Sequence, residues 1–79
     1  MPTVLVEGPY RFFFFSRENL EAPHIHVERD DCYAKLWLEP QVSLASSRGF
    51  RSHELTEILR ITVVNRDPFL QKWHEHLRR

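Results

Sequence analysis

The sequence has little cysteine, no excess of charge of one sign and no long apolar run. Its one cysteine, Cys32, cannot form an internal disulfide and leaves no thiol pair for a zinc knuckle. The longest apolar run, Phe12 to Phe15, is far shorter than the roughly 20 residues that a membrane-spanning helix needs. The first residues do not form a basic segment that leads into an apolar stretch, so we expect no export signal. These absences predict a protein of the reducing cytoplasm with no membrane contact.

The charged residues balance each other over the whole chain but not within each part of it. Lys and Arg number 11 and Asp and Glu number 11, which excludes binding to nucleic acid or anionic lipid through bulk positive charge. Residues 1–47 contain four basic and seven acidic residues, whereas residues 48–79 contain seven basic and four acidic ones. We therefore expect an acidic first part and a basic second part, which keeps nucleic acid open as a partner of the basic part.

Hydrophobic alternation predicts three or four short strands in the first part of the chain. The 79 residues leave room for one domain, spanning residues 1–79. Alternation and aromatic content place the strands at about residues 10–16, 24–29, 32–38 and 42–45. Short polar turns between these segments are typical of an antiparallel meander.

The hydrophobic period becomes helical near Ser52, which we expect to be an N-cap for a helix over residues 52–65. Asp67 followed by Pro68 predicts a second helix over residues 68–77 with Asp67 as its N-cap, although one long helix kinked at Pro68 also fits. The expected fold is α+β, a three- to four-stranded antiparallel meander followed by one or two C-terminal helices packed on one face.

The segment His24-Ile25-His26-Val27-Glu28 places three polar side chains on one face of a strand, about 7 Å apart. Two imidazoles can serve as acid and base in phosphodiester cleavage, and together with a carboxylate they are ligand types of zinc or iron. They can equally be the solvated face of a strand whose other face is core. A metal would need a third ligand, for which the candidates are His53, His74 and His76. We predict no resident metal and no cofactor.

Four consecutive phenylalanines make the first predicted strand apolar on both faces. Alternation sends Phe12 and Phe14 to one face and Phe13 and Phe15 to the other. Helices on one side and Trp37 with loops on the other could cover the strand. Alternatively, a second chain covers one face, because an exposed aromatic patch would favour aggregation.

Arg48 and Arg51 precede the N-terminus of the first predicted helix. Free backbone amides there, together with the guanidinium groups, would suit a phosphate or a carboxylate. A solvated arginine-containing loop is the alternative.

Several blocks along the chain resemble one family of small bacterial proteins. They are Pro2-Thr3, Tyr10-Arg11-Phe12-Phe13-Phe14, Pro23-His24-Ile25-His26-Val27-Glu28, Ala34-Lys35-Leu36-Trp37-Leu38-Glu39-Pro40, Gly49-Phe50, Glu54-Leu55 and Trp73-His74-Glu75. This order resembles the domain of unknown function 4160 family over essentially the whole chain. The resemblance implies a stand-alone cytosolic protein encoded beside another small protein, in an arrangement like a toxin–antitoxin module, and it brings no catalytic residues with it.

We therefore expect a bacterial, cytosolic component of a toxin–antitoxin-like two-gene module that binds the protein encoded by the neighbouring gene, with nucleic acid as a further target. A homodimer through the aromatic strand is also expected. One alternative is a ribonuclease-like phosphodiesterase or metal-dependent hydrolase that uses His24 and His26. Another is a binding domain without chemistry of its own. The residues expected to bind a partner are Glu28, Arg48, Arg51, Phe13, Phe15 and Trp37.

Overall fold

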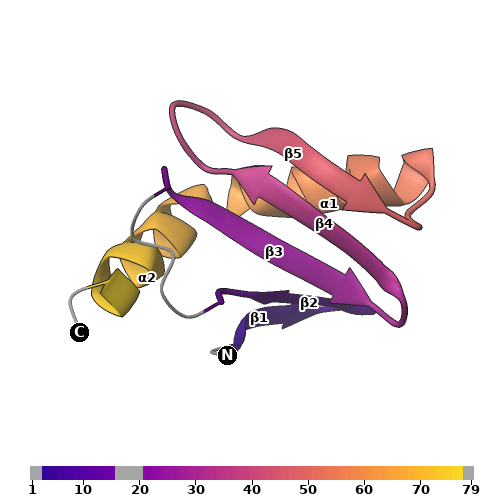
Figure 1. Ribbon diagram of the computed structural model, residues 1–79, viewed down its shortest axis with the longest axis horizontal. Helices are drawn as coiled ribbons and strands as arrows, with labels where there is room; N and C mark the ends of the chain where they lie inside the picture. Colours follow the sequence, from indigo (N-terminus) through magenta and orange to yellow (C-terminus); the bar gives the residue numbers. More distant parts are fainter. Residues whose placement is uncertain (1–2, 16–20, 78–79) are drawn as a thin grey trace.

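The chain forms a five-stranded antiparallel sheet followed by two helices. The computed structural model describes residues 3–15 and 21–77. The strands are β1 (Thr3–Glu7), β2 (Tyr10–Phe13), β3 (His24–Arg29), β4 (Cys32–Trp37) and β5 (Ser43–Arg48), and the helices are α1 (Ser52–Val64) and α2 (Arg66–Leu77). The strands pair in chain order, β1-β2-β3-β4-β5, so the sheet is a meander (Figure 1). The predicted α+β fold class is confirmed, with one strand more than the largest number expected.

The additional strand is β1, which the sequence reading missed. Its residues Thr3-Val4-Leu5-Val6 are mostly β-branched, and Gly8 at φ 58° makes the tight turn into β2. β5 runs from Ser43 to Arg48, whereas a strand over 42–45 was expected. The Ser-Ser-Arg end of β5 breaks the hydrophobic pattern, but its backbone continues to pair with β4 as far as the Tyr33 and Arg48 register pair. Backbone hydrogen bonding therefore extends this strand beyond what its side chains indicate.

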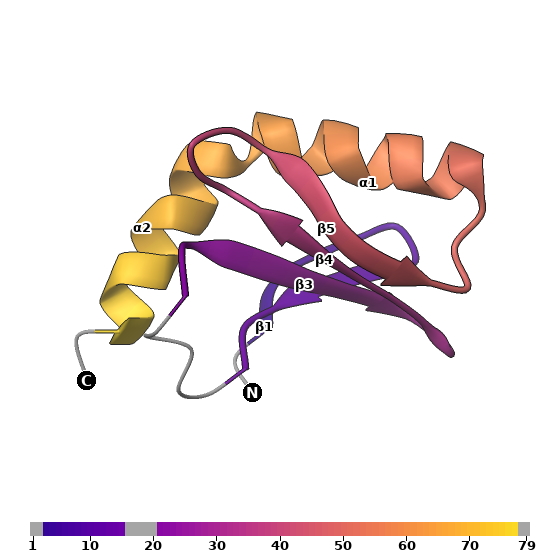
Figure 2. The same cartoon turned by 45° about the horizontal axis from the view of Figure 1, so that its top comes forward.

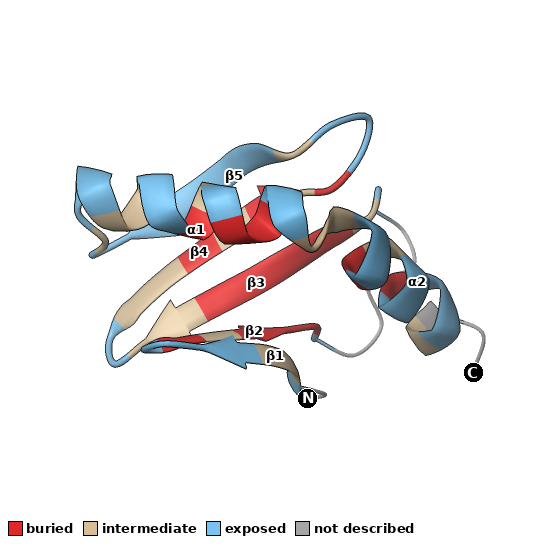
Figure 3. Cartoon of the chain, turned by 180° about the vertical axis from the view of Figure 1, so that it is seen from behind, coloured by how far each residue is buried: buried red, intermediate tan, exposed pale blue. Residues whose placement is uncertain are grey.

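Both helices lie on the same side of the sheet (Figure 2). The core fills the space between them and the sheet, and buried segments run along β3 with patches on β2, β4 and both helices (Figure 3). The sheet contributes Phe12, Ile25, Val27, Ala34 and Leu36, and the helices contribute Ile58, Ile61, Phe69 and Trp73. Burying each large apolar side chain in this cluster contributes about 1.5–3 kcal/mol.

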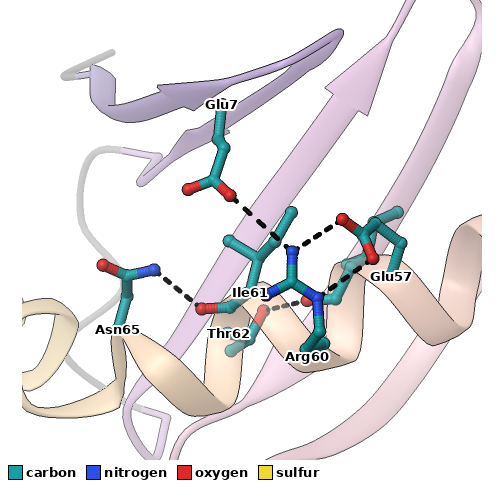
Figure 4. A network of polar contacts seen from close by, with 7 residues as sticks. Glu7, Glu57, Arg60, Ile61, Thr62 and Asn65 are labelled. Atoms are coloured by element: carbon teal, nitrogen blue, oxygen red, sulfur yellow. Dashed lines mark hydrogen bonds and ion pairs between the residues drawn. The ribbon is translucent and has the colours of Figure 1, made fainter.

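The two helices are separate and meet at Asn65. The side-chain amide of Asn65 donates a hydrogen bond to the Ile61 carbonyl at 2.8 Å and so ends α1, as Figure 4 shows. The Asn65 carbonyl accepts the N–H of Phe69 at 2.9 Å and so begins α2. Pro68 lies in the first turn of α2, where a missing N–H costs nothing. The helix that was expected to begin at Pro68 thus begins at Arg66, and the expectation that Asp67 is its N-cap was wrong.

The N-cap of α1 is Arg51, so the expectation that Ser52 takes this position was also wrong. The carboxylate of Glu54 accepts the Arg51 N–H at 3.0 Å. The Glu54 carboxylate in the first turn thus satisfies the backbone N–H of the N-cap residue and places a negative charge at the positive end of the helix dipole. At the other end of the helix, Arg60 pairs with Glu57 at 2.7 Å and reaches Glu7 of β1 at 3.9 Å (Figure 4).

Candidate functional site on the open face of the sheet

The sheet face opposite the core carries most of the residues that the sequence singled out. We name it the open face and define it by the side chains that alternate with the core residues along β2 to β5. They are Arg11, Phe13, His24, His26, Glu28, Tyr33, Lys35, Trp37 and Arg48. Phe15 joins this group, because its ring centroid lies 5.1 Å from that of Phe13 and 4.4 Å from that of His26. Of the predicted site residues, only Arg51 lies elsewhere.

His24 is completely buried although it is on this face. Its Nδ1–H donates to the Ala22 carbonyl at 2.9 Å. Its ring packs against Trp73 of α2 at 4.8 Å and against Trp37 at 5.6 Å between centroids. The imidazole therefore connects the start of β3 to α2, a position typical of a core histidine rather than of a solvated one.

His26 is also buried, with 3% of its surface exposed. Its Nδ1 forms a hydrogen bond with the Tyr33 hydroxyl at 2.7 Å, and its ring packs against those of Phe13 and Phe15. The ring centroids of His24 and His26 are 4.9 Å apart. The two histidines are thus neighbours, as acid–base chemistry would require, but a general acid or base must also reach its substrate directly or through one water. Their burial favours an orienting and packing role.

The described residues contain no group of three His, Cys, Asp or Glu side chains that could hold a metal ion. His53 and His74, two candidate third ligands, are exposed on the helices. The third, His76, places its Nε2 3.0 Å from the Phe15 carbonyl and stacks on Phe14. The geometry of these residues therefore offers no support for a metal-dependent hydrolase.

Three cations of the open face each lie over an aromatic ring. Arg11 lies 4.5 Å from the Phe13 centroid, and Lys35 lies 4.6 Å from that of Trp37. Arg48, at the end of β5, lies 5.9 Å from the centroid of Tyr33. Such cation–π contacts contribute about 0.5–1 kcal/mol at exposed positions and hold long side chains in defined places.

Two of these cations also form ion pairs. Arg11 pairs with Glu28 at 2.6 Å, and Lys35 pairs with Glu21. The hydrogen bond from Lys35 holds the pKa of the Glu21 carboxyl below its usual range. Arg48 forms no ion pair with a described residue, so its charge remains the one most available to a partner.

Arg51 lies outside the open face, at the start of α1. The anion site that the sequence predicted at this helix N-terminus is taken by Glu54, whose carboxylate binds the Arg51 N–H and pairs with Arg29 at 2.6 Å. These two contacts, in that order, lower the pKa of Glu54. The chain's own carboxylate thus occupies the position that would have suited a bound phosphate or carboxylate.

Sequence reasoning missed three residues of the open face, namely Arg11, Tyr33 and Lys35. The alternation along residues 32–38 already put Tyr33 and Lys35 on the same face as Trp37. That signal was available but could not show which aromatic ring each cation would cover, because this depends on the register between strands.

Among the described residues, neither helix has the length and apolar character needed to cross a lipid bilayer. No curated protein and no solved structure matches the chain. A family model described as "Domain of unknown function (DUF4160)" matches residues 10–74, from the start of β2 to near the end of α2, and the chain therefore belongs to this family.

Proposed function

We propose that this protein is the binding component of a toxin–antitoxin-like two-gene module in a bacterial cytoplasm, and that it binds its protein partner through the open face. The observation that carries the proposal is the gathering of Trp37, Tyr33, Arg11 and Arg48 on the sheet face opposite the hydrophobic core. Trp, Tyr and Arg are the residue types most enriched among the energetically dominant positions of protein interfaces.

The electrostatics of the open face also support a protein partner. Arg11 and Lys35 are already neutralised by Glu28 and Glu21, which leaves Arg48 as the exposed unpaired cation of this face within residues 3–15 and 21–77. One available cation among aromatic side chains suits a mixed apolar and acidic protein surface better than a polyphosphate backbone, which requires several. His24 and His26 are buried, which supports a binding function that uses no histidine chemistry. The alternative function is that of a ribonuclease-like hydrolase.

The test is co-expression of the chain with the protein encoded by the adjacent gene, followed by size-exclusion chromatography with light scattering. We expect a stable complex that Trp37→Ala weakens at least tenfold, because truncating an interface tryptophan costs about 2 kcal/mol or more. Arg48→Glu is expected to weaken it as well, by removing the available cation and placing an anion at the rim.

The matched control for the charge reversal is Lys72→Glu, on the exposed side of α2. It should leave the complex unchanged. A complex that forms equally well with Trp37→Ala and Arg48→Glu would remove the open face as the binding surface, and the lack of any complex would remove the two-gene module.

A further inference from the structure

The edge strand β5 differs from every other strand in that every one of its residues is exposed. All six residues, Ser43 to Arg48, are exposed, and none belongs to the core cluster. At the opposite edge, by contrast, Val4 and Leu5 of β1 pack against the core. Among the described residues, β5 is hydrogen-bonded in the sheet to β4 alone, and Figure 1 shows it at the rim of the sheet. Backbone pairing with β4 is thus what holds this strand in place.

The sequence of β5 offers little protection against further pairing. Natural edge strands are blunted by lysines, prolines, inward-pointing charges or bulges. β5 has no proline and no charge before Arg48, and its side chains are mostly those of Ser and Ala. Its one protective feature is a register shift against β4 that leaves Ala45 as an extra residue. The outer edge of β5 therefore presents backbone donors and acceptors with small side chains around them.

We propose that β5 pairs with β5 of a second copy of this chain, antiparallel and across a two-fold axis, so that two five-stranded sheets become one. An antiparallel arrangement puts Arg48 of each copy beside the Ser43 end of the other, about 17 Å from its own counterpart. The small residues Ala45 and Ser46 then meet at the axis, where backbones must approach closely. No like charges oppose each other in this pairing.

The two-fold axis of such a pairing stands perpendicular to the sheet. Both open faces therefore point to the same side and both sets of helices to the other. The dimer presents two copies of the aromatic and cationic surface as one continuous face, with the two Arg48 side chains near its middle. A partner with two equivalent segments would gain avidity from this arrangement.

The test measures the mass of the isolated protein by sedimentation equilibrium over a dilution series. We expect the mass to rise from 9.5 kDa toward twice that value with concentration. The pair Ala45→Lys and Ser46→Lys should keep the chain monomeric at every concentration, because it brings like charges together at the axis. Mixing this variant with the pair Ala45→Glu and Ser46→Glu should restore a dimer, which a variant that merely misfolds could not do.

The control is Val6→Lys, which adds one positive charge to the other edge strand at a position with 65% exposure. It should dimerise like the parent chain. A parent chain that stays monomeric at every concentration overturns the proposal. So does a dimer that persists in the double lysine variant but is lost in Val6→Lys or in Phe15→Ser. These outcomes are independent of the neighbouring gene's product, so they can be told apart from a failure of the proposed function.

Discussion

The Nδ1 atom of His26 on β3 lies 2.7 Å from the hydroxyl oxygen of Tyr33 on β4, and the two side chains are diagonal neighbours on the open face. Direct register pairs His26 with Lys35 and Tyr33 with Glu28, so this hydrogen bond crosses the ladder. It gives the ring nitrogen of a nearly buried histidine a polar partner and fixes the phenol over which Arg48 lies. This hydrogen bond thus connects the buried His26 to the part of the open face where Arg48 is exposed.

Removing this hydroxyl should destabilise the fold measurably. Tyr33→Phe keeps the ring but leaves the His26 Nδ1 without this partner, which should lower the free energy of unfolding by about 1–2 kcal/mol. Urea denaturation monitored by tryptophan fluorescence measures the change. Tyr10→Phe is the control, since the Tyr10 hydroxyl makes no hydrogen bond to a described residue, and it should change stability much less. Equal losses in both variants would show that the His26 contact contributes nothing specific.

The role of His24 can be tested by comparing two substitutions. His24→Ala leaves a cavity beside Trp73 and should cost about 3 kcal/mol, as other large-to-small core changes do. His24→Phe retains a ring of similar size and loses the hydrogen bond to Ala22, so a cost of about 1 kcal/mol is expected. Denaturant unfolding gives both values. His24→Phe should still form the complex with the neighbouring gene's product, whereas loss of that complex in a folded variant would contradict a purely structural role.

The sequence predicted the faces of these strands correctly but not what covers them. Alternation assigned Ile25 and Val27 to the core and His24 and His26 to the other face, and the structure agrees on both. It could not predict that the histidines are buried, because Phe15 and Trp73 reach them from outside the strand. Tertiary contacts of this kind produce no periodic pattern in the sequence from which they could be predicted.

The sequence also predicted the helix ends only in part. The sequence placed a helix start near Ser52 and a break near Pro68, and the structure has α1 beginning at Ser52 and α2 beginning at Arg66. The errors concern which residue occupies each N-cap position, since Arg51, supported by the Glu54 carboxylate, and Asn65 precede the two helices where Ser52 and Asp67 were expected. Several polar residues within one turn can cap a helix, and the choice depends on partners such as Arg29, which come from distant strands.

The contacts of Glu54 predict a loss of stability in acid. The Arg51 N–H and the Arg29 guanidinium hold the pKa of Glu54 below its ordinary value of 4.5. Because this pKa is lower in the folded than in the unfolded chain, the contribution is fully present above the unfolded value and disappears as pH falls through the folded value. Glu54→Gln should therefore flatten the decline of unfolding free energy between neutral and acidic pH. Glu75→Gln, exposed on α2, should leave the decline unchanged, and identical profiles for Glu54→Gln and the parent chain would refute the linkage.

The turn between β5 and α1 depends on the absence of a side chain at Gly49. Its φ of 88° lies in the left-handed region, and a Cβ there would come within 3.0 Å of the Cys32 Sγ and 3.4 Å of the Cys32 Cα. Gly49→Ala should therefore lower the free energy of unfolding by more than the roughly 1 kcal/mol of backbone strain alone, because the atoms that the new Cβ meets include backbone of β4.

Gly8→Ala is the matched control, since Gly8 also has a positive φ but nothing lies within 4 Å of its Cβ position. Comparing the two free energies of unfolding separates the steric cost from the conformational one, and adding Cys32→Ala to Gly49→Ala should recover part of the difference. If Gly49→Ala and Gly8→Ala cost the same, the close approach to Cys32 does not determine the choice of glycine at this turn.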